Sequence, residues 1–159
     1  MFWREPIQRT PEGDFRVRMS REERELLRKL SIDLRSLLGS DPDEEDLRRL
    51  FPPAYEQDDA GEAEYRGLMR DELLEGRRRA LHVLEETADR ERLQEEDVHS
   101  WLGALNDLRL VLGTRLGVTE ELYERDLDVG EPRASELAVY LYLTWLQEQL
   151  IEVVQAKPS

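Results

Sequence analysis

The sequence predicts a mainly α fold, a compact antiparallel helical bundle that carries a small N-terminal β-hairpin. Leucines recur at intervals of three and four along most of the chain, whereas alternation with a period of two is confined to its beginning. The links between the helical segments are short, which favours antiparallel neighbours. We therefore expect residues 1–159 to form a single domain, with a β-hairpin region at 1–19 and a helical bundle at 20–155.

The hairpin is expected from two short segments, Arg4–Thr10 and Phe15–Met19, on either side of a turn. Residues 11–14 read PEGD, and proline and glycine so close together are typical of turns. In the second segment apolar side chains alternate with arginines, as in a strand with one buried face. A hairpin of this size is not stable alone, so we expect it to lie on the helices.

The first helix is predicted to begin at Ser20. Glu23 stands at the spacing of a capping box, in which the serine hydroxyl and the glutamate carboxylate each accept a free backbone N–H. Leucines then recur at helical spacing, at Leu27, Leu30, Leu34 and Leu37. Gly39 is expected to end this helix in a left-handed conformation. A short helix is predicted at Asp43–Phe51, and the two prolines after it end it.

Two long helices are predicted in the middle of the chain. The first covers Ala60–Thr87, with a break expected near Arg70, and Asp89–Leu93 is predicted to be a polar link. The second covers Gln94–Leu116, with Gly117 as its C-terminal cap. Its expected core positions are Trp101, Leu105, Leu108, Leu112 and Leu116.

The last helix is predicted at Arg133–Gln155, after a short turn at Thr119–Asp126. Pro132 fits the first turn of a helix, where no N–H is needed. The helix contains LAVYLYLTWL and is apolar on nearly every side. A helix of this kind is normally central in a bundle or covered by a second subunit. The sequence therefore predicts either full burial in one subunit or a homodimer through the last helix.

The composition narrows the classes of partner. Asp and Glu total 37 against 23 Lys and Arg, so the formal charge is −14. Such a charge repels nucleic acid and anionic membrane surfaces and favours basic partners. The chain has no cysteine, which excludes disulfides and thiolate metal sites from it. No apolar signal region or membrane-length apolar run is present, so we expect a cytoplasmic protein.

No motif for catalysis or metal binding stands out. The chain lacks Gly-x-Ser-x-Gly, the Walker glycine loop and Gly-x-Gly-x-x-Gly, so we expect no enzyme activity and no cofactor. Glu96-x-x-His99 has the spacing used in di-iron bundles, but the other histidine, His82, stands in the reverse order with Glu85. We expect no metal site. The one dense basic run, Arg77–Arg79, lies among glutamates that can pair with it along the helix.

Two polar stretches are candidate sites. In FPPAYEQDD, residues 51–59, the prolines hold the loop extended, so Phe51 and Tyr55 can act as fixed anchors. Asp58 or Asp59 is placed to cap the next helix. The stretch is interpreted either as a loop pinned to the core or as the rim of a partner or ligand site.

The second stretch, WLGALNDLRLVLGTRLG at 101–117, sets Asn106, Asp107 and Arg109 among apolar residues. Asn106 and Arg109 share a helix face that borders the core. A half-buried arginine needs an acidic partner, and candidates lie at 58–64. The hypothesis is one polar cluster, made of Tyr55, Asp58, Asp59, Arg66, Asn106 and Arg109. It is interpreted as a structural strut, a small anion or carboxylate site, or a plain exposed face.

The same two stretches carry a family resemblance. FPPAY at 51–55 followed by DD at 58–59, EYR at 64–66, and the 101–117 stretch resemble an uncharacterised actinobacterial family, a "domain of unknown function". The genes of that family typically lie beside that of ClpS, the adaptor that feeds substrates to the Clp protease. The resemblance covers about residues 15–155 and implies a single helical cytoplasmic domain with an association to regulated proteolysis. It transfers no catalytic residue.

The function expected from these observations is a non-enzymatic regulatory or protein-binding domain linked to Clp-dependent proteolysis. The alternative is a small-molecule or anion-binding domain, with or without enzyme activity, that uses Arg109 and Asn106. A transcriptional regulator is the second alternative, and it requires a contiguous basic face.

Overall fold

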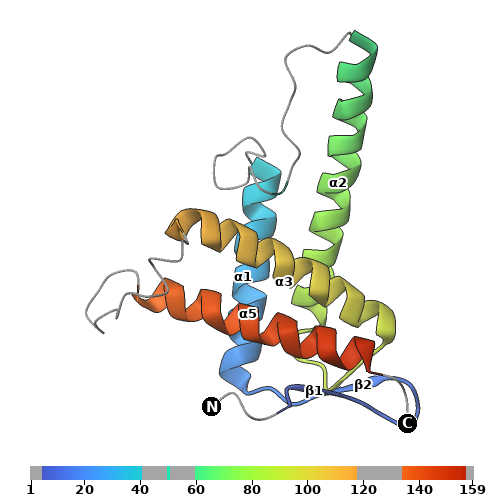
Figure 1. The fold of residues 1–159 in the computed structure, drawn as a ribbon, viewed down its shortest axis with the longest axis vertical. Helices are drawn as coiled ribbons and strands as arrows, with labels where there is room; N and C mark the ends of the chain where they lie inside the picture. The colour runs from blue at the N-terminus through green and yellow to red at the C-terminus, as the bar shows by residue number, and fades with distance from the viewer. Residues whose placement is uncertain (1–4, 41–49, 51–59, 118–133, 157–159) are drawn as a thin grey trace.

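The fold is mainly α with a small N-terminal sheet, as the sequence predicts. A computed structural model describes residues 5–40, 50, 60–117 and 134–156 (Figure 1). The element order is β1 (Ile7–Arg9), β2 (Phe15–Val17), α1 (Arg21–Ser40), α2 (Ala60–Thr87), β3 (Arg92–Leu93), α3 (Glu95–Leu116) and α5 (Ala134–Gln155). The predictions for residues 43–49, 51–53, 119–126 and 130–133 lie outside the described residues.

The sheet contains the predicted hairpin and one further strand. β1 pairs antiparallel with β2, and β2 pairs antiparallel with β3, where Phe15 lies opposite Leu93. Both of these side chains are fully buried. The polar link predicted at 89–93 therefore contains a strand. A strand of two residues is too short to show a period, and it forms here because β2 offers a free edge.

Helix α1 begins as predicted but ends differently. The backbone N–H of Glu23 donates to Ser20 Oγ at 3.1 Å, and that of Ser20 donates to Glu23 Oε1 at 3.3 Å, which confirms the capping box. The prediction that Gly39 ends the helix in a left-handed conformation is wrong, because α1 continues to Ser40 and φ of Gly39 is not positive. The last turn of α1 lies close to Arg78 of α2, and this packing favours helix over a glycine cap.

Helix α2 has the predicted bounds but not the predicted break. It is continuous through Arg70, because strong helix formers on both sides outweigh a local capping signal. Its N-terminal half projects beyond the other helices (Figure 1). Leu68 is 61% exposed and Met69 41% exposed on this projecting part.

The central helix is α3, not the last helix. α3 packs against α2 on one side and α5 on the other, and it also contacts α1. Gly117 caps α3 in the left-handed conformation with φ of 59°, as predicted. α5 lies at the edge, against α3 and β1 (Figure 1). Burial of α5 on every side is therefore not found among the described residues. None of the described helices combines the length and the apolar character needed to span a membrane.

Candidate functional site

The predicted polar cluster is only partly within the described residues. Tyr55, Asp58 and Asp59 lie outside them, and so does the side chain of Arg66. Asn106 and Arg109 lie on α3. The proximity of Tyr55 to Arg109 therefore stays a prediction.

Arg109 connects α3 to α5. Its Nε donates to Thr144 Oγ1 at 3.1 Å, and its Nη1 donates to Gln147 Oε1 at 2.5 Å. The guanidinium carbon also lies 5.8 Å from the ring centre of Tyr140, within the range of a cation–π contact. The partners of Arg109 among the described residues are thus neutral groups on the next helix. Of the acidic residues expected to pair with Arg109, Asp58, Asp59 and the side chain of Glu62 lie outside the described residues, and Glu64 is exposed on α2.

The buried charge of the stretch is Asp107, and it connects α3 to α2. Asp107 forms an ion pair with Arg77, and only 2% of the aspartate is exposed. Burial raises the pKa of Asp107, while the Arg77 charge and hydrogen bonds from Arg77 and Asn106 act in the opposite direction. The expected partners of Arg77 were glutamates on its own helix, whereas its partner on α3 is Asp107. The sign of this buried ion pair in the sequence is Asp107 itself, a charged residue between the core positions Leu105 and Leu108.

α5 is also held by an aromatic residue that the sequence analysis did not single out. The Tyr142 hydroxyl donates to Glu23 Oε2 at 2.6 Å, and Glu23 is the same residue that caps α1. The ring of Tyr142 lies 5.9 Å from that of Trp145. Tyr142 and the partners of Arg109 lie on the two flanks of α5, on either side of its buried leucines, and tie the helix to α1 and α3. The side of α5 that carries Leu141 is left outward.

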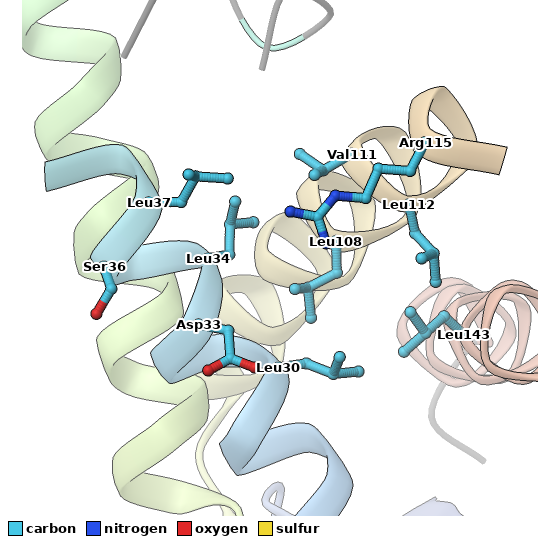
Figure 2. A pocket seen from close by; sticks show the side chains of 10 residues that line it. All are labelled: Leu30, Asp33, Leu34, Ser36, Leu37, Leu108, Val111, Leu112, Arg115 and Leu143. Carbon is cyan, nitrogen blue, oxygen red and sulfur yellow. The ribbon is translucent and has the colours of Figure 1, made fainter. Parts of the chain in front are cut away.

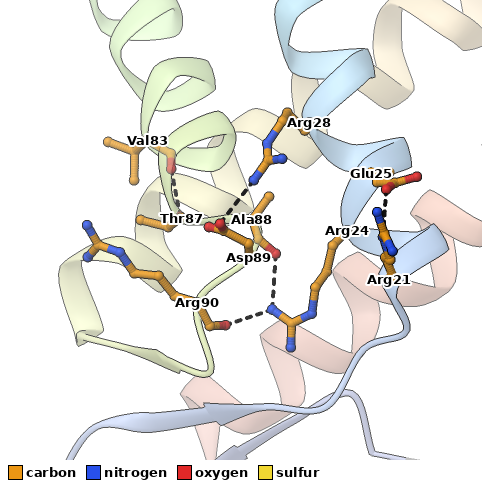
Figure 3. A network of polar contacts seen from close by, with 9 residues as sticks. All are labelled: Arg21, Arg24, Glu25, Arg28, Val83, Thr87, Ala88, Asp89 and Arg90. Carbon is orange, nitrogen blue, oxygen red and sulfur yellow. Dashed lines mark hydrogen bonds and ion pairs between the residues drawn. The ribbon is translucent and has the colours of Figure 1, made fainter.

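Arg24 of α1 contacts Ala88 and Arg90 in the turn after α2 (Figure 3), and it also reaches the end of β2. Its guanidinium donates to the backbone carbonyls of Met19 at 3.1 Å, Ala88 at 3.0 Å, Arg90 at 2.7 Å and Val17 at 3.3 Å. These carbonyls lie at the end of β2 and in the turn from α2 to β3. A guanidinium suits this role because its donors form a fixed fork. This contact anchors the hairpin and is structural in kind.

An apolar cavity lies where α1, α3 and α5 meet (Figure 2). Its volume is about 430 Å³. Seven aliphatic side chains line it, namely Leu30, Leu34, Leu37, Leu108, Val111, Leu112 and Leu143. The polar lining residues are Asp33, Ser36 and Arg115, and neither Asn106 nor Arg109 is among them. The small-molecule alternative built on Arg109 therefore has no support from this cavity.

The outward face of α5 is apolar and acidic. Leu141 is 42% exposed and Ile151 is 36% exposed, and both lie on this edge helix. Glu148 and Glu152 are exposed near them. The helix contains three glutamates and neither lysine nor arginine. This face can bury apolar side chains against a partner and offers only negative charge to it.

Titratable residues elsewhere form small groups. His82 lies beside Arg35 and is 3.9 Å from Glu85 Oε2, and Arg35 Nη2 lies 2.7 Å from the same oxygen. These contacts link α1 to α2. Within the part of the chain that the structure describes, no group of three histidine or carboxylate side chains is placed to hold a metal ion.

Comparison with known proteins gives relatives in mycobacteria. The chain is 35% identical over 130 residues to the oxidative stress regulator AosR of Mycobacterium tuberculosis strain H37Rv, and the AosR of Mycobacterium bovis gives the same identity. Each of these alignments covers 71% of this chain and 59% of the relative. A relative from Mycobacterium leprae is 34% identical over 132 residues, covering 72% of this chain and 60% of its own. The chain thus spans about three-fifths of the length of these relatives. No solved structure matches it.

The family comparison covers nearly the whole chain. Residues 4–154 match the family described as "Domain of unknown function (DUF2017)". This range contains the sheet and the described helices, except for the last residue of α5. The chain therefore belongs to the DUF2017 family.

Proposed function

We propose that this chain is a non-enzymatic, cytoplasmic regulatory domain that binds a basic protein partner through the outward face of α5. The relatives that carry the name of an oxidative stress regulator support the regulatory part of this proposal. The charge of −14 supports a basic partner over a nucleic acid. The observation that carries the proposal is the α5 face itself.

The α5 face has three properties that suit a partner site. Its exposed apolar side chains, Leu141 and Ile151, gain free energy when they leave water. Its inner side is fixed by Arg109 and Tyr142, so the face is held in place before binding. The exposed carboxylates of Glu148 and Glu152 attract lysine or arginine on the partner.

A homodimer through α5 is the competing occupant of this face. The charged groups that two copies of α5 would bring together are all carboxylates, because α5 has no lysine or arginine. Like charges at an interface oppose association. We therefore favour a different, basic protein over a second copy, and the experiment below distinguishes them.

This sequence contains no cysteine, so a thiol that senses an oxidant would have to lie outside these 159 residues. The resemblance to a family encoded beside ClpS makes the machinery of Clp-dependent proteolysis one place to seek the basic partner. This link rests on association and not on a contact in the structure.

The test compares two single substitutions in tagged protein purified from its own cells. Leu141→Glu adds a charge at the centre of the α5 face, whereas Leu68→Glu adds the same charge on the projecting part of α2. We expect Leu141→Glu to lose a co-purifying basic protein that wild type and Leu68→Glu retain. Retention by all three contradicts the proposal. A wild-type mass of two chains that falls to one chain of 18.8 kDa in Leu141→Glu identifies a homodimer instead.

A further inference from the structure

We propose that a cleft between the C-terminal half of α5 and the N-terminal hairpin receives an arginine side chain of the basic partner, with its guanidinium between the carboxylates of Glu5 and Glu152. The partner itself rests on the proposed function, and the cleft adds the group by which the partner is recognised. The cleft is distinct from the apolar cavity between α1, α3 and α5, because no described residue lines both.

The cleft lies where α5 packs against β1, at the end of the fold that carries the sheet (Figure 1). One wall is the hairpin segment from Glu5 to Gly13. The other wall is one flank of α5, made of Gln149, Glu152, Val153 and Ala156 at helical spacing. The volume of about 670 Å³ lies in the range of ligand sites, roughly 300–1,000 Å³. The cleft is open to solvent on one side, so a side chain of another protein can reach it.

Carboxylates stand on both walls of the cleft. Glu5 precedes β1 and Glu152 lies on α5, and both are exposed. Glu5 Oε2 accepts a hydrogen bond from Gln8 Nε2 at 2.6 Å, and neither carboxylate forms an ion pair within the described part of the chain. The last turn of α5 also lines the cleft, and the C-terminal end of a helix carries partial negative charge. These charges favour a cationic occupant.

The cation among the described lining residues, Arg9, is engaged elsewhere. Its guanidinium carbon lies 4.7 Å from the ring centre of Phe15, which is fully buried. Its Nη2 donates to the backbone carbonyl of Val154 at 3.5 Å. Arg9 is therefore held by an aromatic ring and the end of α5, and the carboxylates of Glu5 and Glu152 remain for a cation from outside.

The cleft continues the outward face of α5. Leu141, Glu148 and Glu152 are spaced by seven and four residues, so they lie on one stripe of the helix. A partner that covers Leu141 and extends along this stripe reaches the cleft at Glu152. A guanidinium suits the cleft better than an ammonium, because its planar fork of N–H donors can serve a carboxylate on each wall.

A short peptide tests the cleft without the partner. The probe is acetyl-Gly-Arg-Gly-amide, and its control contains citrulline, which has a similar shape and no charge. In a ¹³C-methyl NMR titration of the full chain at constant ionic strength, we expect the arginine peptide to shift the signals of Ile7 and Val153, which line the cleft, in the millimolar range. The citrulline peptide should shift neither.

Three outcomes of this titration overturn the proposal. The first is no shift of the cleft signals, and the second is equal shifts with both peptides. The third is a set of NOEs between the Lys157 side chain and the Ile7 methyl groups, because the chain's own cation is then the occupant.

Substitution of the two carboxylates tests the assignment residue by residue. Glu5→Gln and Glu152→Gln should each weaken binding of the arginine peptide about threefold, as expected for an exposed ion pair. Glu136→Gln, which removes the same charge from α5 outside the described lining, is the matched control and should change binding by less than about 1.5-fold because salt screens distant charges. Equal effects of all three substitutions contradict the assignment.

The same substitutions separate this inference from the proposed function. In tagged protein from its own cells, the double substitution Glu5→Gln and Glu152→Gln should lose most of the co-purifying basic protein, which Glu136→Gln retains. If Leu141→Glu loses the partner and the double variant retains it, the cleft assignment is wrong and the proposed function stands. If the peptide binds as expected and Leu141→Glu retains the partner, the proposed function is wrong and the arginine site stands.

Discussion

Asp107 of α3 and Arg77 of α2 form an ion pair in which the aspartate is almost fully buried. The pair sits at the contact between the two helices that pack together most extensively. Burial of a charge costs free energy, and only a well-placed partner offsets that cost. Arg77 is therefore expected to matter more to stability than its two arginine neighbours.

Loss of Arg77 should destabilise the fold strongly. Arg77→Met keeps most of the aliphatic stem but leaves the buried Asp107 carboxylate without its cation. Breaking a buried pair in this way costs about 3–5 kcal/mol, and we expect a value near the lower end because the Arg77 side chain is 23% exposed. Urea denaturation at pH 7 measures the loss. Arg79→Met, on an exposed neighbour, should change stability by less than about 0.5 kcal/mol, and equal effects of the two would refute this role for Arg77.

The elements that the sequence predicted correctly depend on local signals. The Ser20–Glu23 box and the Gly117 cap follow from residues within one turn of the helix end. The elements it missed depend on contacts distant in sequence. β3 has only two residues and forms by pairing with β2, and α1 passes Gly39 because its last turn lies against α2.

The candidate site shows the same difference between what local signals predict and what depends on contacts distant in sequence. The sequence identified Asn106, Asp107 and Arg109 as unusual, because polar side chains interrupt a regular apolar pattern. The partners of Asp107 on α2 and of Arg109 on α5 are 30 or more residues away and had no local signal. The outward position of α5 likewise depends on packing order, which hydrophobicity along one helix does not determine.

The pH dependence of stability should show the raised pKa of Asp107. A carboxyl group whose pKa is higher in the folded state binds its proton more tightly there, so stability increases as pH falls toward the ordinary pKa of 3.8. The free energy of unfolding of wild type minus that of Asp107→Asn should therefore rise as pH is lowered from 7 to 4. Urea denaturation of both proteins across this range provides the measurement. A difference that falls with decreasing pH would mean that the Arg77 charge outweighs burial.

The contribution of Arg24 to stability should require its guanidinium group and not only its positive charge. Arg24→Lys keeps the charge, but a single ammonium cannot reach four carbonyls in different directions. We expect a loss of about 2 kcal/mol by chemical denaturation, since hydrogen bonds from charged groups contribute about 1.5–3 kcal/mol. Arg21→Lys, whose side chain is 87% exposed, should be nearly neutral. Equal stability of the two variants would show that the Arg24 contacts contribute nothing.

Two glycine-to-alanine substitutions should change the stability of the fold in opposite directions. Gly117→Ala places a side chain at a φ of 59°, and we expect a loss of about 1 kcal/mol. Gly76→Ala lies inside α2 with nothing within 4 Å of the added Cβ, so alanine should stabilise the helix by about 0.5–1 kcal/mol. Thermal denaturation of both variants tests the pair. A stabilising effect at Gly117 would contradict the capping geometry.

Site-specific photo-crosslinking in intact cells tests the proposed α5 interface most directly. A photoreactive residue at position 141 lies on the outward face of α5, and the same residue at position 68 on α2 serves as the control. The account predicts one discrete adduct from position 141, absent from position 68, whose cross-linked peptide is rich in lysine or arginine. An adduct of two copies of this chain, or equal adducts from both positions, would contradict it.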